Sequence, residues 1–281
     1  MKFTTFTSSR LRRVFLEGFS AMDIAEPLVS FDREAESASV REFMVTRDFD
    51  LVGVRCEGVV SGYVRQADLD SGICGDRLQS FIPGDDLVSG NASLIEVVRS
   101  LAINAQCFVT ILDQVGGIVT LSDLEKPPMR MFLFGMITLG EMLMTDLIRH
   151  RYPDEAWRGL ISPQRLAKAL ALQQERRRRG QNAELLNCLQ YGDKGWILSR
   201  DKEVREALGQ KSRRDAIQSL KELETLRNNL AHTQEIVPTG WQRIVIACSR
   251  FEQNLEMLAD SRNLMAPSRA TNPSAQNAKS D

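Results

Sequence analysis

Arg227, Asn228 and His232 are the residues of this chain whose types and spacing are best suited to chemistry. The segment from Ser212 to His232 is predicted to be a helix, because its apolar residues recur at three- and four-residue steps. On that helix Arg227 falls within the apolar stripe, and Asn228 and His232 stack one turn apart on its margin. A guanidinium, a carboxamide and an imidazole therefore meet at the edge of an apolar face, where charged groups are usually paired or functional.

Glu141 is a second charged residue in an apolar setting. It lies in the middle of a helix predicted at Met129–Arg149, which is apolar on nearly every side and reads as the central buried helix of a bundle. A lone carboxylate in that place needs a partner, and Arg227 is the candidate. The pair would be structural if it is buried and saturated, and catalytic if Arg227 keeps free donors facing a cleft. A purely structural motif, with Arg227 in an ion pair and His232 complementing the helix dipole, is the alternative.

The pattern Arg227-Asn228-x-x-x-His232, between the predicted helix before it and another at Trp241–Arg262, resembles the R-N-x-x-x-H motif of the HEPN family, helical domains that include many RNases. The resemblance implies a homodimer whose two motifs meet. It also implies metal-independent RNA cleavage, in which the ribose 2′-oxygen attacks the adjacent phosphate. His232 would move a proton near neutral pH, and Arg227 would hold the phosphate oxygens. Asn228 would orient His232 or donate to a non-bridging oxygen, and catalysis would require no cofactor.

Composition excludes several classes of site. The 281 residues are enough for two domains, and a net charge of −1 does not mark the whole molecule as a polyanion binder. Five scattered cysteines without a C-x-x-C pair argue against a disulfide framework and a zinc site. With only two histidines, a histidine-rich metal centre is nearly excluded, so we expect no metal site. The sequence contains no Walker-type loop and no nucleophile elbow.

The sequence gives no reason to expect a membrane protein. The N-terminus, MKFTTFTSSRLRRVFLEGF, lacks the continuous apolar core of a signal peptide. The one membrane-like run, Met131–Ile148, carries Glu141 and Asp146 and is flanked by arginines, so a fully buried helix fits it better than a transmembrane one. We therefore expect a cytoplasmic protein without a membrane partner.

An internal repeat fills the N-terminal half. Each copy should contain a helix, a strand, a turn, a second strand and a polar helix start. In the first copy these elements are expected at Ser37–Thr46, Leu51–Val54, Glu57-Gly58, Val59–Val64 and Asp68. In the second they are expected at Ser93–Asn104, Cys107–Leu112, Asp113-Gln114, Val115–Leu121 and Asp123. Two such copies of about fifty residues predict an α+β tandem module.

Short motifs at both ends of this module carry a resemblance of their own. The module opens with a D-I-x-x-P pattern, and its second copy closes with G-h-h-T/S-x-x-D, through Asp23, Ile24, Pro27, Gly117, Thr120 and Asp123. These patterns resemble those of the cystathionine-β-synthase (CBS) domain pair. The resemblance implies an adenine nucleotide as regulatory ligand (AMP, ADP, ATP or S-adenosylmethionine), with Thr120 and Asp123 taking its ribose and phosphate. Gly117 would let the backbone come close, and the Asp123 carboxylate can accept two ribose hydroxyls.

The first copy departs from this pattern. It keeps Asp68 but has Arg65 where Thr or Ser is expected. Arg65 would either bind a phosphate directly or mark a copy that binds nothing. For the second copy the alternative is a helix cap made by Thr120, Ser122 or Asp123 in a purely structural or dimerising pair.

The C-terminal half is predicted to be helical. Beyond the elements already named, we expect a helix at Ser162–Arg179 ending in four arginines, a helix at Ala183–Tyr191 and a loop at Gly192–Ser199. The arginines complement the helix dipole, and they would either be solvated or attract RNA phosphates. The predicted domains are a leader (1–18), a tandem CBS module (19–124, with copies at about 19–72 and 76–124), a HEPN-like domain (125–262) and a disordered tail (263–281).

The predicted fold class is therefore an α+β CBS pair followed by an all-α HEPN-like helical bundle. Combined, the two resemblances imply a nucleotide-sensing regulator whose CBS pair controls a dimeric HEPN effector, an endoribonuclease acting on RNA in stress or defence. The competing interpretation is a non-catalytic nucleotide-binding protein. In that protein the helical domain only dimerises or docks a partner, and the Arg-His motif is structural.

Overall fold

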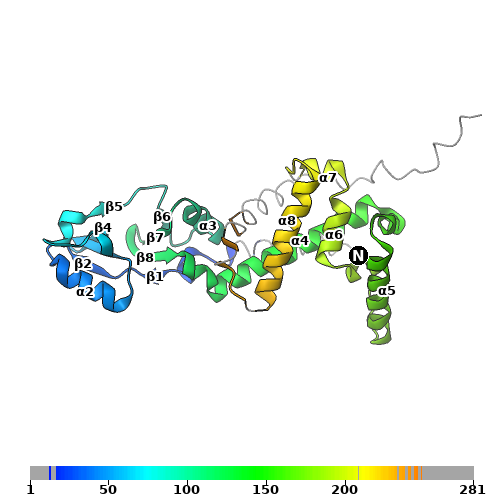
Figure 1. Ribbon diagram of the computed structural model, residues 1–281, viewed down its shortest axis with the longest axis horizontal. Coiled ribbons are helices and arrows are strands. Elements are labelled where there is room, and N and C mark those ends of the chain that lie inside the picture. The colour runs from blue at the N-terminus through cyan, green and yellow to red at the C-terminus, as the bar shows by residue number, and fades with distance from the viewer. Residues whose placement is uncertain are drawn as a thin grey trace, which may run out of the picture. The chain divides into compact units, whose positions relative to one another are not determined.

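The structure is a computed structural model (Figure 1). It describes residues 17–207, 209–232 and 234–237, with residues 13, 240, 241, 244, 245 and 248. These residues form two compact units. The N-terminal unit holds the described residues up to Phe132 and those from Val237 to Val245, and the helical unit holds those from Leu133 to Ile236 with Arg13 and Cys248. Most of the leader, the tail and most of the helix expected at Trp241–Arg262 lie outside the described residues.

The N-terminal unit repeats one α/β pattern twice. The first copy consists of η1 (Ala21–Asp23), β1 (Glu26–Pro27), β2 (Ser30–Asp32), α2 (Ser37–Arg47), β3 (Leu51–Cys56), β4 (Val59–Arg65) and η2 (Gln66–Asp68), where η marks a 3-10 helix. The second consists of η3 (Cys74–Arg77), β5 (Gln79–Ser80), β6 (Leu87–Ser89), α3 (Leu94–Ile103), β7 (Gln106–Ile111), β8 (Gln114–Thr120) and η4 (Leu121–Glu125). The predicted repeat is confirmed, and each copy also begins with two short strands that the sequence pattern did not indicate.

Each sheet includes one strand from the other copy. The strand orders are β2-β3-β4-β5 and β1-β8-β7-β6. Strand β1, at the start of the first copy, pairs with β8 through Glu26 and Ile118, and β5, at the start of the second copy, pairs with β4 through Gly62 and Ser80. The two copies therefore interlock.

Local sequence explains where these elements begin and how closely they pack. Ser93 caps α3 by accepting a hydrogen bond from the Glu96 amide at 3.3 Å, and the Glu96 carboxylate accepts from the Ser93 amide at 3.1 Å. At Gly62 a Cβ atom would lie 2.4 Å from the Gln79 carbonyl oxygen, so only glycine lets β5 pair beside β4.

The helical unit is built from seven helices among the described residues. They are α4 (Pro127–Arg151, which begins in the N-terminal unit), η5 (Pro153–Leu160), α5 (Pro163–Arg178), η6 (Leu185–Cys188), α6 (Tyr191–Leu198), α7 (Lys202–Ala207) and α8 (Arg213–Ala231). Their core includes Trp157, which is 1% exposed, with Ile148, Leu186, Ile197 and Val204. The predicted fold class is confirmed at this level, as an α/β region followed by a mostly helical one.

Two predictions in the helical unit were wrong. The helix expected at Ala183–Tyr191 is the short η6, and the loop expected at Gly192–Ser199 is helix α6. Gly192 and Gly195 suggested a loop, but in the structure Gly195 permits close packing between two helices. A Cβ atom at Gly195 would lie 2.5 Å from the Leu220 Cδ2 atom of α8, so the glycine brings the two helices into contact.

Helix α4 is the one described helix that is long and apolar enough to cross a membrane, a test that buried helices of soluble proteins also pass. The expectation that it is fully buried was wrong, because 50% of its most apolar window is buried. Met131 and Phe134 are 58% and 47% exposed. With the exposed Thr138 they recur at helical spacing, so one face of α4 remains uncovered in the chain.

Candidate functional site

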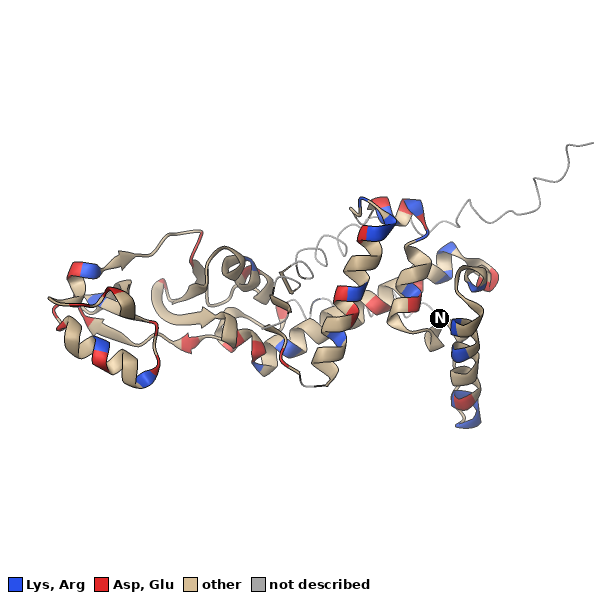
Figure 2. Ribbon diagram, viewed as in Figure 1, with Lys and Arg blue, Asp and Glu red and all other residues tan. Residues whose placement is uncertain are grey.

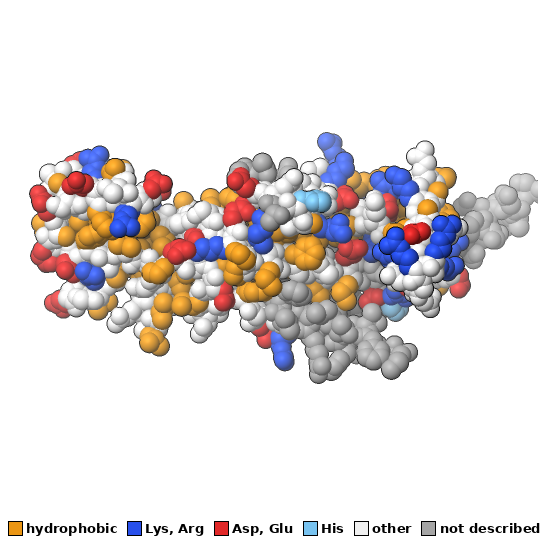
Figure 3. All heavy atoms as spheres, turned by 90° about the horizontal axis from the view of Figure 1, so that it is seen from below, with side chains coloured by type: hydrophobic (Ala, Val, Ile, Leu, Met, Phe, Trp, Pro, Cys, Tyr) orange, Lys and Arg blue, Asp and Glu red, His pale blue; other side chains and the backbone are white. Residues whose placement is uncertain are grey.

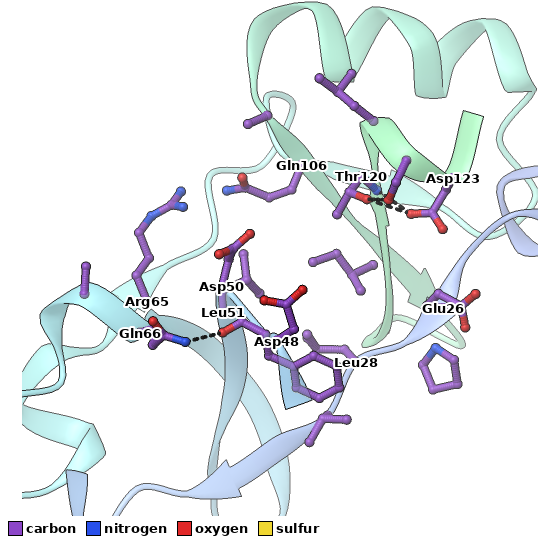
Figure 4. Close-up of a pocket in the computed structure, with 18 residues that line it drawn as sticks. Glu26, Leu28, Asp48, Asp50, Leu51, Arg65, Gln66, Gln106, Thr120 and Asp123 are labelled. Carbon is purple, nitrogen blue, oxygen red and sulfur yellow. Dashed lines mark hydrogen bonds between the residues drawn. The ribbon is translucent and has the colours of Figure 1, made fainter. Parts of the chain in front are cut away.

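A pocket of about 820 Å³ opens in the N-terminal unit and is lined by both copies (Figure 4). Each copy contributes the start of its first hairpin strand and the residues that follow its second. The lining residues are Asp48–Leu51 and Arg65–Ala67 from the first copy, Ala105, Gln106, Ile118 and Thr120–Asp123 from the second, and the connecting segment Glu26–Val29. The volume lies within the range of small-molecule sites.

Thr120 and Asp123 both line this pocket and are hydrogen-bonded to each other. The Asp123 Oδ2 atom accepts hydrogen bonds from the Thr120 amide at 2.7 Å and from the Thr120 hydroxyl at 3.0 Å. The Thr120 and Ser122 hydroxyl oxygens are 2.8 Å apart. These contacts cap η4, so the capping role proposed as the alternative is present, and the same residues also line the pocket.

Lys126 holds two pocket carboxylates from outside the lining. Its Nζ atom lies 2.9 Å from Asp123 Oδ1, donates to the Ile24 carbonyl at 2.7 Å and also contacts the Glu26 carboxylate. Burial acts to lower the pKa of Lys126, but the hydrogen bonds to Glu26 and Asp123 outweigh it and raise the pKa. Lys126 therefore remains a cation and neutralises part of the pocket's negative charge.

The two first-copy residues expected to bind the ligand, Arg65 and Asp68, differ in their position relative to the pocket. Arg65 lines the pocket, and its guanidinium carbon lies 5.5 Å from the centre of the Tyr63 ring. The Arg65 side chain has no hydrogen bond or ion pair with another described residue. Asp68 does not line the pocket, because its carboxylate accepts a hydrogen bond from the Gln79 side chain at 2.9 Å. The expected first-copy site is thus represented in the pocket by Arg65 alone.

Gly117 is also outside the pocket lining. It pairs with Pro27 of β1 and with Val109 of β7. A Cβ atom there would lie 3.2 Å from the Val109 Cβ atom and 3.4 Å from the Glu26 carbonyl oxygen. The glycine therefore serves the close approach of strands, and the structure does not support the expected close approach to a ligand.

Sequence reasoning missed two pocket acids, Asp48 and Asp50. Both point into the pocket in Figure 4. Asp48 ends α2 in the left-handed region, with φ 57° and ψ 44°. Neither carboxylate makes a hydrogen bond or ion pair with a described residue. The internal repeat could have indicated these two acids, because they precede β3 in the first copy as the pocket residue Ala105 precedes β7 in the second.

The resulting pocket is acidic. Carboxylates of Glu26, Asp48, Asp50 and Asp123 line it with one guanidinium, that of Arg65. Ionised carboxylates accept hydrogen bonds and donate none, so the pocket suits a ligand rich in hydroxyl and amino groups. A chain of several phosphates would meet like charge.

The Arg-His motif ends helix α8 in the helical unit. Arg227 is half-buried, and its side chain forms no hydrogen bond or ion pair with another described residue. Asn228 and His232 are exposed, and the Asn228 carbonyl accepts a hydrogen bond from the His232 amide at 3.0 Å, which closes the helix. The buried face of α8 is rotated from the predicted stripe, because Ser219 and Leu226 are buried and Ala231 is exposed.

The predicted pairing of Glu141 with Arg227 was wrong. The partner of Glu141 is Lys194 of α6, whose ammonium donates to Glu141 Oε1 at 2.8 Å and whose side chain is 5% exposed. The sequence prediction missed Lys194 because its segment was expected to be a loop. Burial raises the pKa of Tyr191 on α6. The negative charges of Glu141 and Glu224 raise this pKa further, and the positive charge of Arg227 lowers it. Glu141 and Arg227 thus share a neighbour, Tyr191.

The four arginines do lie where α5 ends, where the ribbon of Figure 2 is coloured blue and red and blue side chains surround a red one in Figure 3. Arg176 turns inward, donating to the Asn187 carbonyl at 3.1 Å. Arg178 and Arg179 share Glu175, at 3.8 and 2.9 Å. The Arg177 side chain forms no hydrogen bond or ion pair with a described residue. Most of the positive charge of this run is therefore paired or turned inward.

Comparison with known proteins gives a likeness in structure alone. No family model and no curated protein matches the chain. The chain is similar to a solved structure of CBSX2 in complex with AMP, with 17% identity over 38% of this chain and 93% of that chain and a TM-score of 0.34. It is also similar to the CBS domain of a bacterial CNNM/CorC family Mg²⁺ transporter in complex with ATP (16% identity, 42% and 91% covered, TM-score 0.34). A third structure is a putative acetoin utilization protein, AcuB, from Vibrio cholerae (18% identity, 38% and 87% covered, TM-score 0.34).

Proposed function

We propose that this protein is a regulator that senses an adenine nucleoside or nucleotide through the pocket of its N-terminal unit. The observation that carries the proposal is that Thr120 and Asp123, which match the CBS closing pattern, line one pocket of about 820 Å³ together with Ser122 and the strand-exchanged segment Glu26–Val29. The Asp123 carboxylate would take the ribose hydroxyls, and Thr120 and Ser122 would supply hydroxyls beside it.

The charge of the pocket supports a ligand with few negative charges. Four carboxylates face one guanidinium, and each added phosphate would raise the repulsion. Without divalent cations, adenosine and S-adenosylmethionine should therefore bind more tightly than AMP, and AMP more tightly than ATP. Arg65 is the one cation of the lining and would contact the first phosphate.

Calorimetric titration of the full chain with adenosine, S-adenosylmethionine, AMP and ATP tests this proposal. Asp123→Asn should weaken adenosine binding at least about tenfold, since a hydrogen bond to a charged group contributes about 1.5–3 kcal/mol. Asp50→Asn should instead strengthen ATP binding by removing a repulsive charge. Asp113→Asn, at an exposed turn outside the pocket, is the matched control. Absence of binding by every adenine ligand would refute the nucleotide-sensing proposal.

We further propose that the helical domain is a HEPN-type effector, a homodimeric and metal-independent endoribonuclease acting through Arg227, Asn228 and His232. Exposure of Asn228 and His232 supports this candidate, as does an Arg227 without an ion pair among the described residues. In this reaction the ribose 2′-oxygen would bond to the adjacent phosphorus as the bond to the leaving 5′-oxygen breaks, which gives a cyclic phosphate end. His232 would move the proton from the 2′-hydroxyl toward the leaving oxygen, and Arg227 would hold the phosphate oxygens as charge develops.

Cleavage of a mixed RNA pool in EDTA, with and without adenosine or AMP, tests the effector. The wild type should cleave and His232→Ala should not, while His150→Ala, which changes the chain's other histidine, should cleave like the wild type. Cleavage by all three proteins would point to another site. If no protein cleaves under any ligand, the helical domain is better described as a non-catalytic dimerisation or interaction module.

A further inference from the structure

Lys126 connects η4, which contributes residues to the pocket lining, to the first residue of helix α4. Its side chain contacts Asp123 and Glu26, both of which line the pocket. Its backbone belongs to both neighbouring helices. The Lys126 amide donates to the Asp123 carbonyl at 3.1 Å, which ends η4, and its carbonyl accepts from the Arg130 amide at 3.1 Å, which begins α4. A movement of Lys126 must therefore disturb both the end of η4 and the first turn of α4.

Glu125 fixes the same connection from the neighbouring position. Its Oε2 atom lies 2.9 Å from Arg130 Nη1, and its Oε1 atom accepts a hydrogen bond from the Val237 amide at 2.8 Å. The first turn of α4 is thus held by two neighbouring side chains. One of them, Glu125, is bound to α4 itself, and the other, Lys126, is bound to the acids of the pocket.

A ligand and Lys126 would compete for the same oxygen. Asp123 Oδ2 already accepts two hydrogen bonds from Thr120, and Oδ1 is taken by Lys126. Asp123 is only 7% exposed, so few directions of approach remain. A ribose diol that donates two hydrogen bonds to this carboxylate must take over the position of the ammonium.

We propose that Lys126 is a positioning residue that a bound ligand displaces. In the empty pocket Lys126 holds Asp123 and Glu26 and thereby fixes the start of α4; a nucleoside on Asp123 replaces it and loosens the first turn. This inference rests on the proposed nucleoside binding and adds the step by which binding is transmitted to α4. Ligand affinity and the order of the first turn of α4 then both depend on the same competition between the ligand and Lys126 for Asp123.

Lys126→Met tests this competition, because methionine keeps the apolar stem and removes the ammonium. Adenosine should then bind the full chain more tightly, by about five- to tenfold, since no cation must be displaced. In the wild type, adenosine should speed hydrogen exchange of the amides at residues 129–132. In Lys126→Met these amides should exchange fast with and without adenosine. Lys126→Arg, which restores a cation, should behave like the wild type.

Lys168→Met is the matched control, because Lys168 is exposed on α5 and makes no hydrogen bond or ion pair with a described residue. The inference is overturned if Lys126→Met binds adenosine like the wild type or keeps the ligand-dependent exchange at residues 129–132. If the wild type binds no adenine ligand, both the proposed function and this inference are refuted. Should Lys126→Met not fold by circular dichroism, Glu26→Gln replaces it. That variant must show a smaller ligand-dependent change than the wild type, and an unchanged response would count against Lys126.

Discussion

Arg151 ends helix α4 with a guanidinium that is 2% exposed. Its Nη2 atom lies 2.8 Å from Asp201 Oδ2 and 2.8 Å from a carboxylate oxygen of Glu203. The Asp201 side chain is 3% exposed and also caps α7 by accepting from the Val204 amide at 3.2 Å. Because removal of one partner leaves the other charge out of water, Arg151→Met should lower the unfolding free energy by about 3–5 kcal/mol. Urea unfolding followed by tryptophan fluorescence measures this, with Arg178→Met, at a side chain that is 77% exposed, expected to change it by under about 0.5 kcal/mol.

Tyr152, the next residue, makes stability depend on alkaline pH. Burial raises its pKa to about 12, and the negative charge of Asp201 adds to the effect. An unfolded tyrosine titrates near pH 10. The stability that the neutral phenol contributes is therefore complete below about pH 10 and is lost as the pH rises toward 12. The wild type should lose more unfolding free energy than Tyr152→Phe between pH 9.5 and 11.5, and parallel losses in both proteins would contradict this.

At the residue scale, the sequence motifs identified Arg65, Thr120 and Asp123, which are among the residues that line the pocket. Thr120 and Asp123 could be predicted because their spacing is fixed by a helix start. Asp48 and Asp50 were missed because an acid before a strand has no motif of its own, and only their place in the repeat, equivalent to Ala105 before β7, points to them. The partner of Glu141 was missed for a different reason. Lys194 lies on helix α6, which was predicted to be a loop because it contains two glycines.

At the scale of elements, the contact of α6 with α8 depends on Gly195. Because a Cβ atom there would lie 2.5 Å from Leu220 Cδ2, Gly195→Ala should force the helices apart and lower the unfolding free energy by about 1–3 kcal/mol. A second change, Leu220→Ala, should recover part of the loss, which a double-mutant cycle measures. Gly159→Ala, at a glycine with nothing within 4 Å of the added atom, should be nearly neutral. An equal effect of both alanines would contradict the packing explanation, since helix propensity alone favours alanine over glycine.

Element type followed from local sequence where the chain had a clear period or cap. Helices α2, α3 and α8 and the hairpins β3–β4 and β7–β8 were predicted to within two residues at each end. Strands β1 and β5 have two residues each and exist through their pairing with the other copy. No window of neighbouring residues contains that information.

For the whole molecule, the five cysteines give a test of packing. Cys56 is half-buried, whereas Cys74, Cys107, Cys188 and Cys248 are buried, and none of the five forms a disulfide. Burial raises the pKa of Cys107 to about 12, so its reactive thiolate is scarce at pH 8. A thiol reagent at pH 8 should therefore modify about one cysteine in the native protein and all five in denaturant. Fewer than five in denaturant would reveal a disulfide.

The exchange of β1 and β5 between the sheets also dictates when this chain can fold during its synthesis. Strand β1 leaves the ribosome early, but its partner residues Gly117 and Ile118 are made only after almost the entire second copy. The first sheet can gain β5 once residues 79 and 80 are made, but Glu26 and Pro27 have no strand to pair with until β8 is made. Contacts between such distant residues close slowly. The nascent N-terminal half should therefore remain incomplete, and a client for chaperones, until translation has passed β8.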